Sequence, residues 1–230
     1  MGLAIKDYHQ GHYSQDLFNE TSISEKDELP LPYLFRPYNQ MPKLEKQALK
    51  HCKGTVLDIG CGAGSHSLYL QQQGFNVTAL DCSTDSIAVC KSRGITQTVA
   101  GDLLDYNRQQ YDTLLILMNG TGIFQQVAKV PLYLNHLKNI LKPGGQILVD
   151  SSDLVYMYNT LENGAIMVPA HMNYYGELEC TLYYKEYVSD PYYWLYLDQK
   201  TFKRLAVGAG FKWEIIAQGS NHDYLARLSF

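Results

Sequence analysis

The sequence VLDIGCGAG, residues 56–64, decides the fold. Residues 56–59 are rich in β-branched side chains and contain no glycine or proline, which is typical of a strand buried on both faces. Gly60 allows the backbone angles of a sharp turn, and the two later glycines leave no side chain between the backbone and a ligand. A ligand over this loop would meet free backbone N–H groups at the start of the helix predicted from Ser65.

A second predicted strand, residues 75–81, ends in the carboxylate of Asp81. A carboxylate at this distance beyond a glycine-rich turn can accept hydrogen bonds from both hydroxyls of a ribose. Taken alone, such a turn is usually structural, and a lone Asp at a strand end is usually a helix cap. Their joint spacing instead predicts a nucleoside site and a cofactor that contains adenosine.

Residues 58–64 resemble the first motif of the class I S-adenosylmethionine-dependent methyltransferases, which is an acid two residues before a GxGxG turn. A dinucleotide fingerprint would require GxGxxG, and position 65 is Ser. The resemblance covers residues 54–152 and implies S-adenosylmethionine as the cofactor. Three further segments follow in the order and spacing of this family: Gly101–Leu103, Tyr111–Asn119 and Leu141–Val149.

The resemblance also implies roles for individual residues. Asp102 is expected to face the exocyclic amine of adenine, and the end of the fourth strand is expected to line the methionine moiety. The expected cofactor-binding residues are Asp58, Gly60, Cys61, Gly62, Gly64, Asp81, Cys82, Asp102, Leu103, Met118 and Asn119.

Strands that alternate with helices predict a parallel sheet covered by helices on both faces. We therefore expect an α/β fold of Rossmann-like, three-layer type, with a mostly parallel seven-stranded sheet whose last strand is antiparallel. Ser83 and Asp198 are expected to cap two of the helices. Residues 1–40 are expected to form an irregular N-terminal lid, and residues 41–230 the methyltransferase domain.

Residues 153–198 interrupt this rhythm with many tyrosines. Residues 177–187 and 192–197 predict an antiparallel hairpin with a turn at Ser189–Pro191. An insertion after the fifth strand would stand above the carboxyl edge of the sheet, where ligands bind in open α/β folds, and would roof an acceptor pocket. Alternatively, these rings pack a β-surface or a dimer interface.

In-line displacement at a sulfonium methyl group requires no obligatory catalytic signature, because the positive charge already activates the leaving group. The Asn-Pro-Pro-Tyr type motif of methyltransferases acting on planar amino groups is absent, and Asn119–Gly122 stand in its place. This departure counts against an amide or adenine nitrogen as acceptor. Candidates for a base or an orienting group are His171, Tyr174, Tyr175 and Asp153, and candidates for acceptor binding are Tyr33, Arg36 and Trp194.

The composition limits which kinds of binding partner are expected. The formal net charge is -4 without a basic stripe, so a nucleic-acid partner is not expected and the acceptor is predicted to be a small molecule. Five cysteines without a CxxC pair favour reduced thiols over disulfides or a metal site. No signal peptide or membrane-spanning run is recognisable, so we expect a cytoplasmic protein that does not bind membranes. The oligomeric state stays open.

Two other functional classes are alternatives to a methyltransferase. A nucleotide-dependent oxidoreductase could use a similar sheet, but the third glycine of its fingerprint is missing. A non-catalytic scaffold could keep the fold without the chemistry, because a fold does not fix a function. The intact acids Asp58, Asp81 and Asp102 favour an enzyme over that scaffold.

Overall fold

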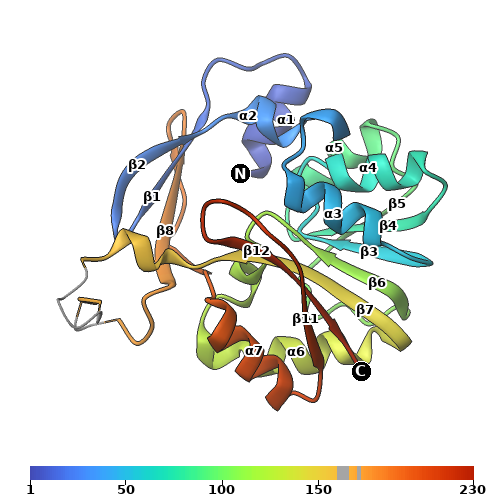
Figure 1. Cartoon of the computed structure of the whole chain (residues 1–230). Helices are drawn as coiled ribbons and strands as arrows, with labels where there is room; N and C mark the ends of the chain where they lie inside the picture. Colours follow the sequence, from blue (N-terminus) through green and yellow to red (C-terminus); the bar gives the residue numbers. More distant parts are fainter. Residues whose placement is uncertain (160–165, 170–171) are drawn as a thin grey trace.

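The computed structural model describes residues 1–159, 166–169 and 172–230, which form two β-sheets and the helices around them (Figure 1). The larger sheet has seven strands in the order β11-β12-β7-β6-β3-β4-β5. Its strands are β3 (Thr55–Ile59), β4 (Asn76–Asp81), β5 (Gln97–Ala100), β6 (Tyr111–Ile116), β7 (Leu141–Ser152), β11 (Lys212–Gln218) and β12 (Asp223–Ser229).

The pairing of these strands confirms the predicted fold class. Strands β3 to β7 run parallel to one another. Strand β12 is antiparallel to both of its neighbours, β7 and β11. The carboxyl ends of the parallel strands therefore meet at one edge of the sheet, where an open α/β fold binds its ligands.

Helices cover both faces of this sheet. They are α3 (Lys43–His51), α4 (Ser65–Gln72), α5 (Thr84–Ser92), α6 (Val130–Asn139) and α7 (Gln199–Gly208). Helices α6 and α7 pack on one face in a core that contains Leu134 and Phe202. Helices α3, α4 and α5 pack on the opposite face, with Ala48, Leu70 and Ile87 buried. The predicted caps are confirmed: Ser83 and Asp198 each accept a backbone N–H of the helix that follows.

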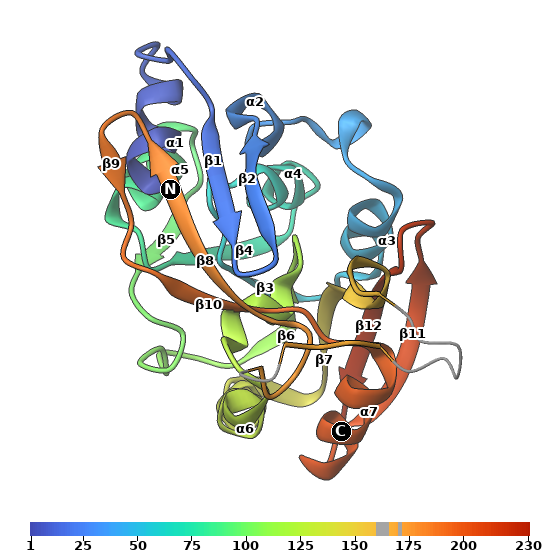
Figure 2. The same ribbon diagram turned by 90° about the vertical axis from the view of Figure 1, so that its left-hand side faces the viewer.

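The second sheet combines two distant parts of the chain. It has the order β10-β8-β1-β2, and β9 pairs with β8. Its strands are β1 (Leu17–Thr21), β2 (Ser24–Leu29), β8 (Glu177–Tyr184), β9 (Tyr187–Val188) and β10 (Tyr192–Leu195). Figure 2 shows this sheet in front of the central one, with β10 crossing toward β6. The short helices are α1 (Gly2–His9), α2 (Leu31–Leu34), η1 (Tyr38–Gln40), η2 (Gly120–Phe124), η3 (Val127–Lys129) and η4 (Leu154–Met157).

The expectation that residues 1–40 are irregular was wrong, because strands β1 and β2 form an antiparallel hairpin there. Strand β1 gains its second partner from β8, with Phe18 opposite Tyr183. Strand β2, with the sequence SEKDEL, is mostly exposed and lacks the apolar alternation of a half-buried strand. A charged edge strand such as β2 has no apolar alternation to read, and β1 in addition depends on the remote strand β8.

The insertion contains the predicted hairpin, but its turn is at a different place. Strand β8 turns at Lys185 and Glu186 into β9, and Lys185 has a left-handed φ of 53°. Residues 189–191, predicted as the turn, instead connect β9 to β10, and both of these strands pair with β8. Pro191 has no backbone N–H to donate to a ladder, which separates the two short strands.

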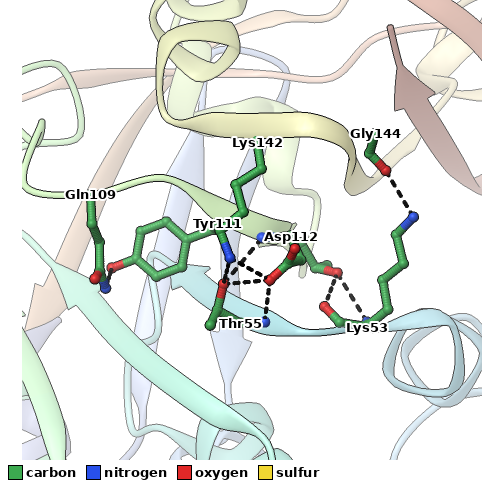
Figure 3. Close-up of polar contacts among 8 residues, drawn as sticks. Lys53, Thr55, Gln109, Tyr111, Asp112, Lys142 and Gly144 are labelled. Atoms are coloured by element: carbon green, nitrogen blue, oxygen red, sulfur yellow. Dashed lines mark hydrogen bonds and ion pairs between the residues drawn. The ribbon is translucent and has the colours of Figure 1, made fainter.

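A polar cluster joins three strands at the amino edge of the central sheet, opposite the expected ligand edge (Figure 3). One carboxylate oxygen of Asp112 accepts hydrogen bonds from the backbone N–H and hydroxyl of Thr55 and from Lys142 Nζ, each at 2.7 Å. These donors lower the pKa of Asp112 below its usual range, the ammonium of Lys142 contributing most. At Gly54, a Cβ would lie 2.3 Å from the same oxygen, so this approach requires a glycine.

We predict that Asp112→Asn lowers the free energy of unfolding by about 1–2 kcal/mol, because donors lose their charged acceptor. Urea denaturation at pH 7 measures the change. The partly exposed Lys142 pair adds little in salt, so Lys142→Gln should cost less than about 1 kcal/mol. Because the folded-state pKa of Asp112 is lowered, its contribution is present above the unfolded pKa of about 4 and disappears as the pH falls further. Equal stability of Asp112→Asn and the wild type at pH 7 would contradict this role.

Candidate functional site

The glycine loop after β3 is fastened to the neighbouring strand β4. The backbone N–H groups of Gly60 and Cys61 both donate to the carbonyl of Leu80, at 2.8 and 3.1 Å. Gly60, Gly62 and Gly64 have φ values of 72°, 53° and 81°, the left-handed region that favours glycine. The sequence argument for the loop therefore matches its backbone.

Asp81 lies directly against this loop. Its Oδ2 accepts the backbone N–H of Gly62 at 2.9 Å, and its Oδ1 accepts that of Ser83 at 2.8 Å. Burial raises the pKa of Asp81, and the two backbone donors oppose that rise. Each oxygen keeps a further lone pair for a ligand hydroxyl. The carboxylate predicted to grip a ribose is thus held in place beside the glycines, and Cys82 next to it is exposed.

Two other predicted cofactor residues are mainly engaged with the protein. Asp58 is 2% exposed, and its Oδ2 accepts the hydroxyl of Ser67 at 2.6 Å. Burial raises the pKa of Asp58. The Cys61 thiol is buried with its Sγ 3.7 Å from that of Cys90. Direct contact of either side chain with a ligand stays a prediction.

Asp102 and Leu103 follow β5 at the same edge of the sheet. Asp102 is exposed, and its Oδ1 accepts the backbone N–H of Leu104 at 2.8 Å. Leu103 is buried in the core with Ile59 and Leu80. The exposed acid beside a buried leucine is compatible with the expected adenine contact, which stays a prediction.

The turn after β6 is strained, and a residue that sequence reasoning missed holds it. Met118 and Asn119 have φ values of 68° and 56°, which are uncommon for residues with a Cβ. Asp150, near the end of β7, accepts the backbone N–H of Met118 at 3.1 Å on Oδ2 and that of Gly120 at 2.8 Å on Oδ1. Its position, near the end of the fifth predicted strand, is the feature of the sequence that could have identified Asp150.

A buried ionic network connects the N-terminal segment to the helix after the glycine loop. Arg36 is 4% exposed and bonds to Glu45 and to the carbonyl of Tyr33, whose ring its guanidinium covers at 3.8 Å. The Nε2 of His66 lies 2.9 Å from the other carboxylate oxygen of Glu45. Burial acts to raise the pKa of Glu45, but His66 and Arg36 lower it below its ordinary value.

Sequence reasoning singled out Tyr33 and Arg36 of this network but missed Glu45 and His66. Glu45 lies on an amphipathic helix, where a charged residue is normally assigned to the exposed face. His66 directly follows the glycine loop, and one histidine in isolation carries no signal. The network shows that Arg36 is a buried residue and that the N-terminal segment is tied to the nucleoside loop through α3 and α4.

The insertion is attached to the central sheet through aromatic side chains. Trp194 packs so closely on η2 that a Cβ at Gly122 would lie 1.9 Å from its indole. The Tyr174 hydroxyl donates to Asp198 at 2.7 Å, and the Tyr175 hydroxyl donates to Asp153 at 2.6 Å. These contacts hold the insertion in place.

The catalytic roles predicted for Tyr174, Tyr175 and Asp153 stay predictions. His171 lies outside the residues that the structure describes. The acceptor-binding role predicted for Trp194 is also untested.

Comparisons with known proteins agree with this geometry. Residues 56–145 match a family model described as a methyltransferase domain. A solved SAM-dependent methyltransferase from Bacteroides fragilis, in complex with S-adenosyl-L-homocysteine, is 41% identical to this chain. The alignment covers 99% of this chain and 93% of that one, with a TM-score of 0.91. The chain therefore belongs to the S-adenosylmethionine-dependent methyltransferases.

Curated relatives match only part of the chain. A cypemycin N-terminal methyltransferase from Streptomyces sp is 30% identical over 103 residues, which are 43% of this chain and 42% of that protein. A ubiquinone biosynthesis O-methyltransferase from Xylella fastidiosa is 31% identical over 103 residues, 42% of this chain and 41% of that protein. The chain thus spans less than half the length of these two relatives.

The residues present fit the nucleoside of the family's cofactor. A Cβ added at Gly62 would meet only the Ile5 side chain, at 4.0 Å, so the space above this part of the loop is open. Asp81 borders the same space and retains accessible surface. Within the described part of the chain, we find no helix whose length and apolarity would let it cross a membrane.

We predict that Asp81→Ala weakens binding of S-adenosylhomocysteine by about 1–3 kcal/mol, because polar groups lose their partner. This corresponds to a Kd roughly 5- to 150-fold higher in titration calorimetry. Asp81→Asn removes the charge but keeps an oxygen that can accept the Gly62 N–H, so it separates these two contributions. Asp105→Asn, which changes an exposed acid, is the control. An unchanged Kd with Asp81→Ala would remove this residue from the site.

Proposed function

We propose that this chain transfers a methyl group from S-adenosylmethionine to a small-molecule acceptor at the carboxyl edge of the central sheet. The observation that carries the proposal is the hydrogen bond from the Gly62 N–H to Asp81 beside an open glycine loop. It presents a carboxylate and a bare backbone together, as recognition of a ribose requires. The family's cofactor supplies a methyl group on a positively charged sulfur.

The chain's own residues then have three tasks. The glycine loop and Asp81 hold the nucleoside, and the turn at Met118–Gly120 lines the methionine end. The second sheet would exclude water and align the acceptor, because β10 contacts η2 directly after β6. Alignment of a nucleophile within about 3 Å of the methyl carbon supplies most of the rate enhancement in such a displacement.

Side chains from several elements converge near Asp150, which supports an acceptor pocket beside the turn after β6. Burial raises the pKa of Tyr196, after β10, to about 12, and the charge of Asp150 on β7 contributes to the rise. Burial also raises the pKa of Tyr33, in α2, and the carboxylates of Glu45 and Asp150 add to it. The N-terminal segment, the insertion and the central sheet thus each place a titratable group within electrostatic reach of Asp150.

The curated relatives do not determine the acceptor. One relative is named as an N-terminal methyltransferase and the other as an O-methyltransferase, and each match covers less than half of this chain. The second sheet includes residues 17–29 and 177–195, which lie outside the matched methyltransferase domain of residues 56–145. We therefore assign the choice of acceptor to these segments. A cytoplasmic location is part of the proposal, supported by five free cysteines.

We predict that methyl-labelled S-adenosylmethionine, incubated with the protein and a cell extract, gives labelled products in the low-molecular-mass fraction. Gly62→Val is the matched control, because the added side chain fills the space above the loop and should abolish labelling. Mass spectrometry of both fractions provides the readout. Label confined to macromolecules would contradict the small-molecule acceptor, and binding of S-adenosylhomocysteine without any label would favour a non-catalytic scaffold.

A further inference from the structure

Asp150 lies at the carboxyl edge of the central sheet, beside the turn after β6. It is near the carboxyl end of β7, and it binds the N–H groups of Met118 and Gly120 on both sides of the turn after β6. These two hydrogen bonds use one lone pair on each carboxylate oxygen, so a further lone pair on each is available. The carboxylate is therefore both fixed in orientation and able to accept from a ligand.

Asp150 is partly buried. The residue retains some accessible surface, yet burial raises its pKa to about 6. The titratable groups in electrostatic contact with Asp150 come from several elements: Tyr33 of α2, Glu45 of α3, His66 of α4, Tyr196 after β10 and Tyr224 of β12.

Within the described residues, Asp150 has no cationic partner, whereas Glu45 has two. Glu45 bonds to both Arg36 and His66. Among the residues that the structure describes, no lysine, arginine or histidine lies within ion-pair distance of Asp150. Because a buried carboxylate without a cation is costly, a site of this kind attracts a positively charged ligand group.

We propose that Asp150 faces the transferred methyl group and selects a basic amine as acceptor, by binding its ammonium form and taking the proton before transfer. This inference rests on the proposed function and adds the class of acceptor to it. A hydroxyl acceptor would gain a hydrogen bond to the Asp150 carboxylate, whereas an ammonium would gain the hydrogen bond and the attraction between opposite charges.

The step balances with the groups at hand. The ammonium nitrogen gives one proton to the carboxylate of Asp150 and so regains its lone pair. That lone pair forms the new N–C bond while the C–S bond breaks, and the electron pair of the broken bond remains on sulfur. The sulfur becomes neutral, and the positive charge appears on the methylated nitrogen. Asp150 loses its proton to solvent after the product leaves.

Binding of sinefungin tests the position of Asp150 without any acceptor. This analogue of S-adenosylmethionine carries an ammonium on carbon in place of the methylated sulfur, whereas S-adenosylhomocysteine has a neutral sulfur there. We expect the wild type to bind sinefungin about tenfold more tightly than S-adenosylhomocysteine in calorimetry. Asp150→Asn should reduce this ratio to near one, even where the altered turn also weakens the binding of both compounds.

Further variants separate this role from support of the turn. Asp150→Glu keeps the charge and should restore part of the ratio, and Asp105→Asn controls for net charge. The ratio should also fall in the wild type as the pH drops through about 6, where Asp150 gains a proton. The proposal would be overturned if Asp150→Asn left the ratio of the two Kd values unchanged. A lower melting temperature and weaker binding of both compounds would then show that Asp150 is purely structural.

The nature of the labelled product tests the choice of acceptor. A methylated amine should be retained on a cation exchanger and survive alkaline treatment. Label in a base-labile ester or a neutral ether would overturn the selection of nitrogen. Failure of the wild type to bind S-adenosylhomocysteine at all would instead contradict the proposed function, so the two failures are distinguishable.

Discussion

The site depends on the hydrogen bond between the Gly62 N–H and Asp81, because it fixes two neighbouring strands of the central sheet at their carboxyl ends. A loop of left-handed glycines is entropically costly to order. The contacts of Gly60 and Cys61 with Leu80 and of Gly62 with Asp81 offset that cost by tying the loop to β4. The glycine loop and Asp81 are therefore held in place by the protein's own hydrogen bonds.

The second constraint is the placement of charge around this loop. Glu45 is balanced by Arg36 and His66, which links the N-terminal segment, α3 and α4 into one buried unit. Asp150 is satisfied by backbone donors alone within the described residues. The nucleoside loop is thus framed by a neutralised network, whereas the region beyond Met118 keeps a net negative group. This asymmetry is the basis for proposing a cationic acceptor.

The sequence was sufficient for most of the fold and for the glycine loop with Asp81 beside it, because those signals are local. The glycine loop, Asp81 and the helix caps at Ser83 and Asp198 each depend on residues a few positions apart. The pairing of β1 with β8 could not be read in this way, because it joins Phe18 to Tyr183. Asp150 and Glu45 were missed for a similar reason, since a carboxylate has no apolar periodicity and its partners lie on other elements.

The local sequence alone predicts a parallel sheet with a glycine loop at its carboxyl edge. Backbone freedom at Gly60 and Gly62, and apolar runs of strand length, impose that result from within one short segment. Only the tertiary structure decided what surrounds the loop. Burial brings Arg36, Glu45 and His66 together and leaves Asp150 without a cation among the described residues. Such side-chain electrostatics arise from contacts between distant segments, which a linear pattern does not encode.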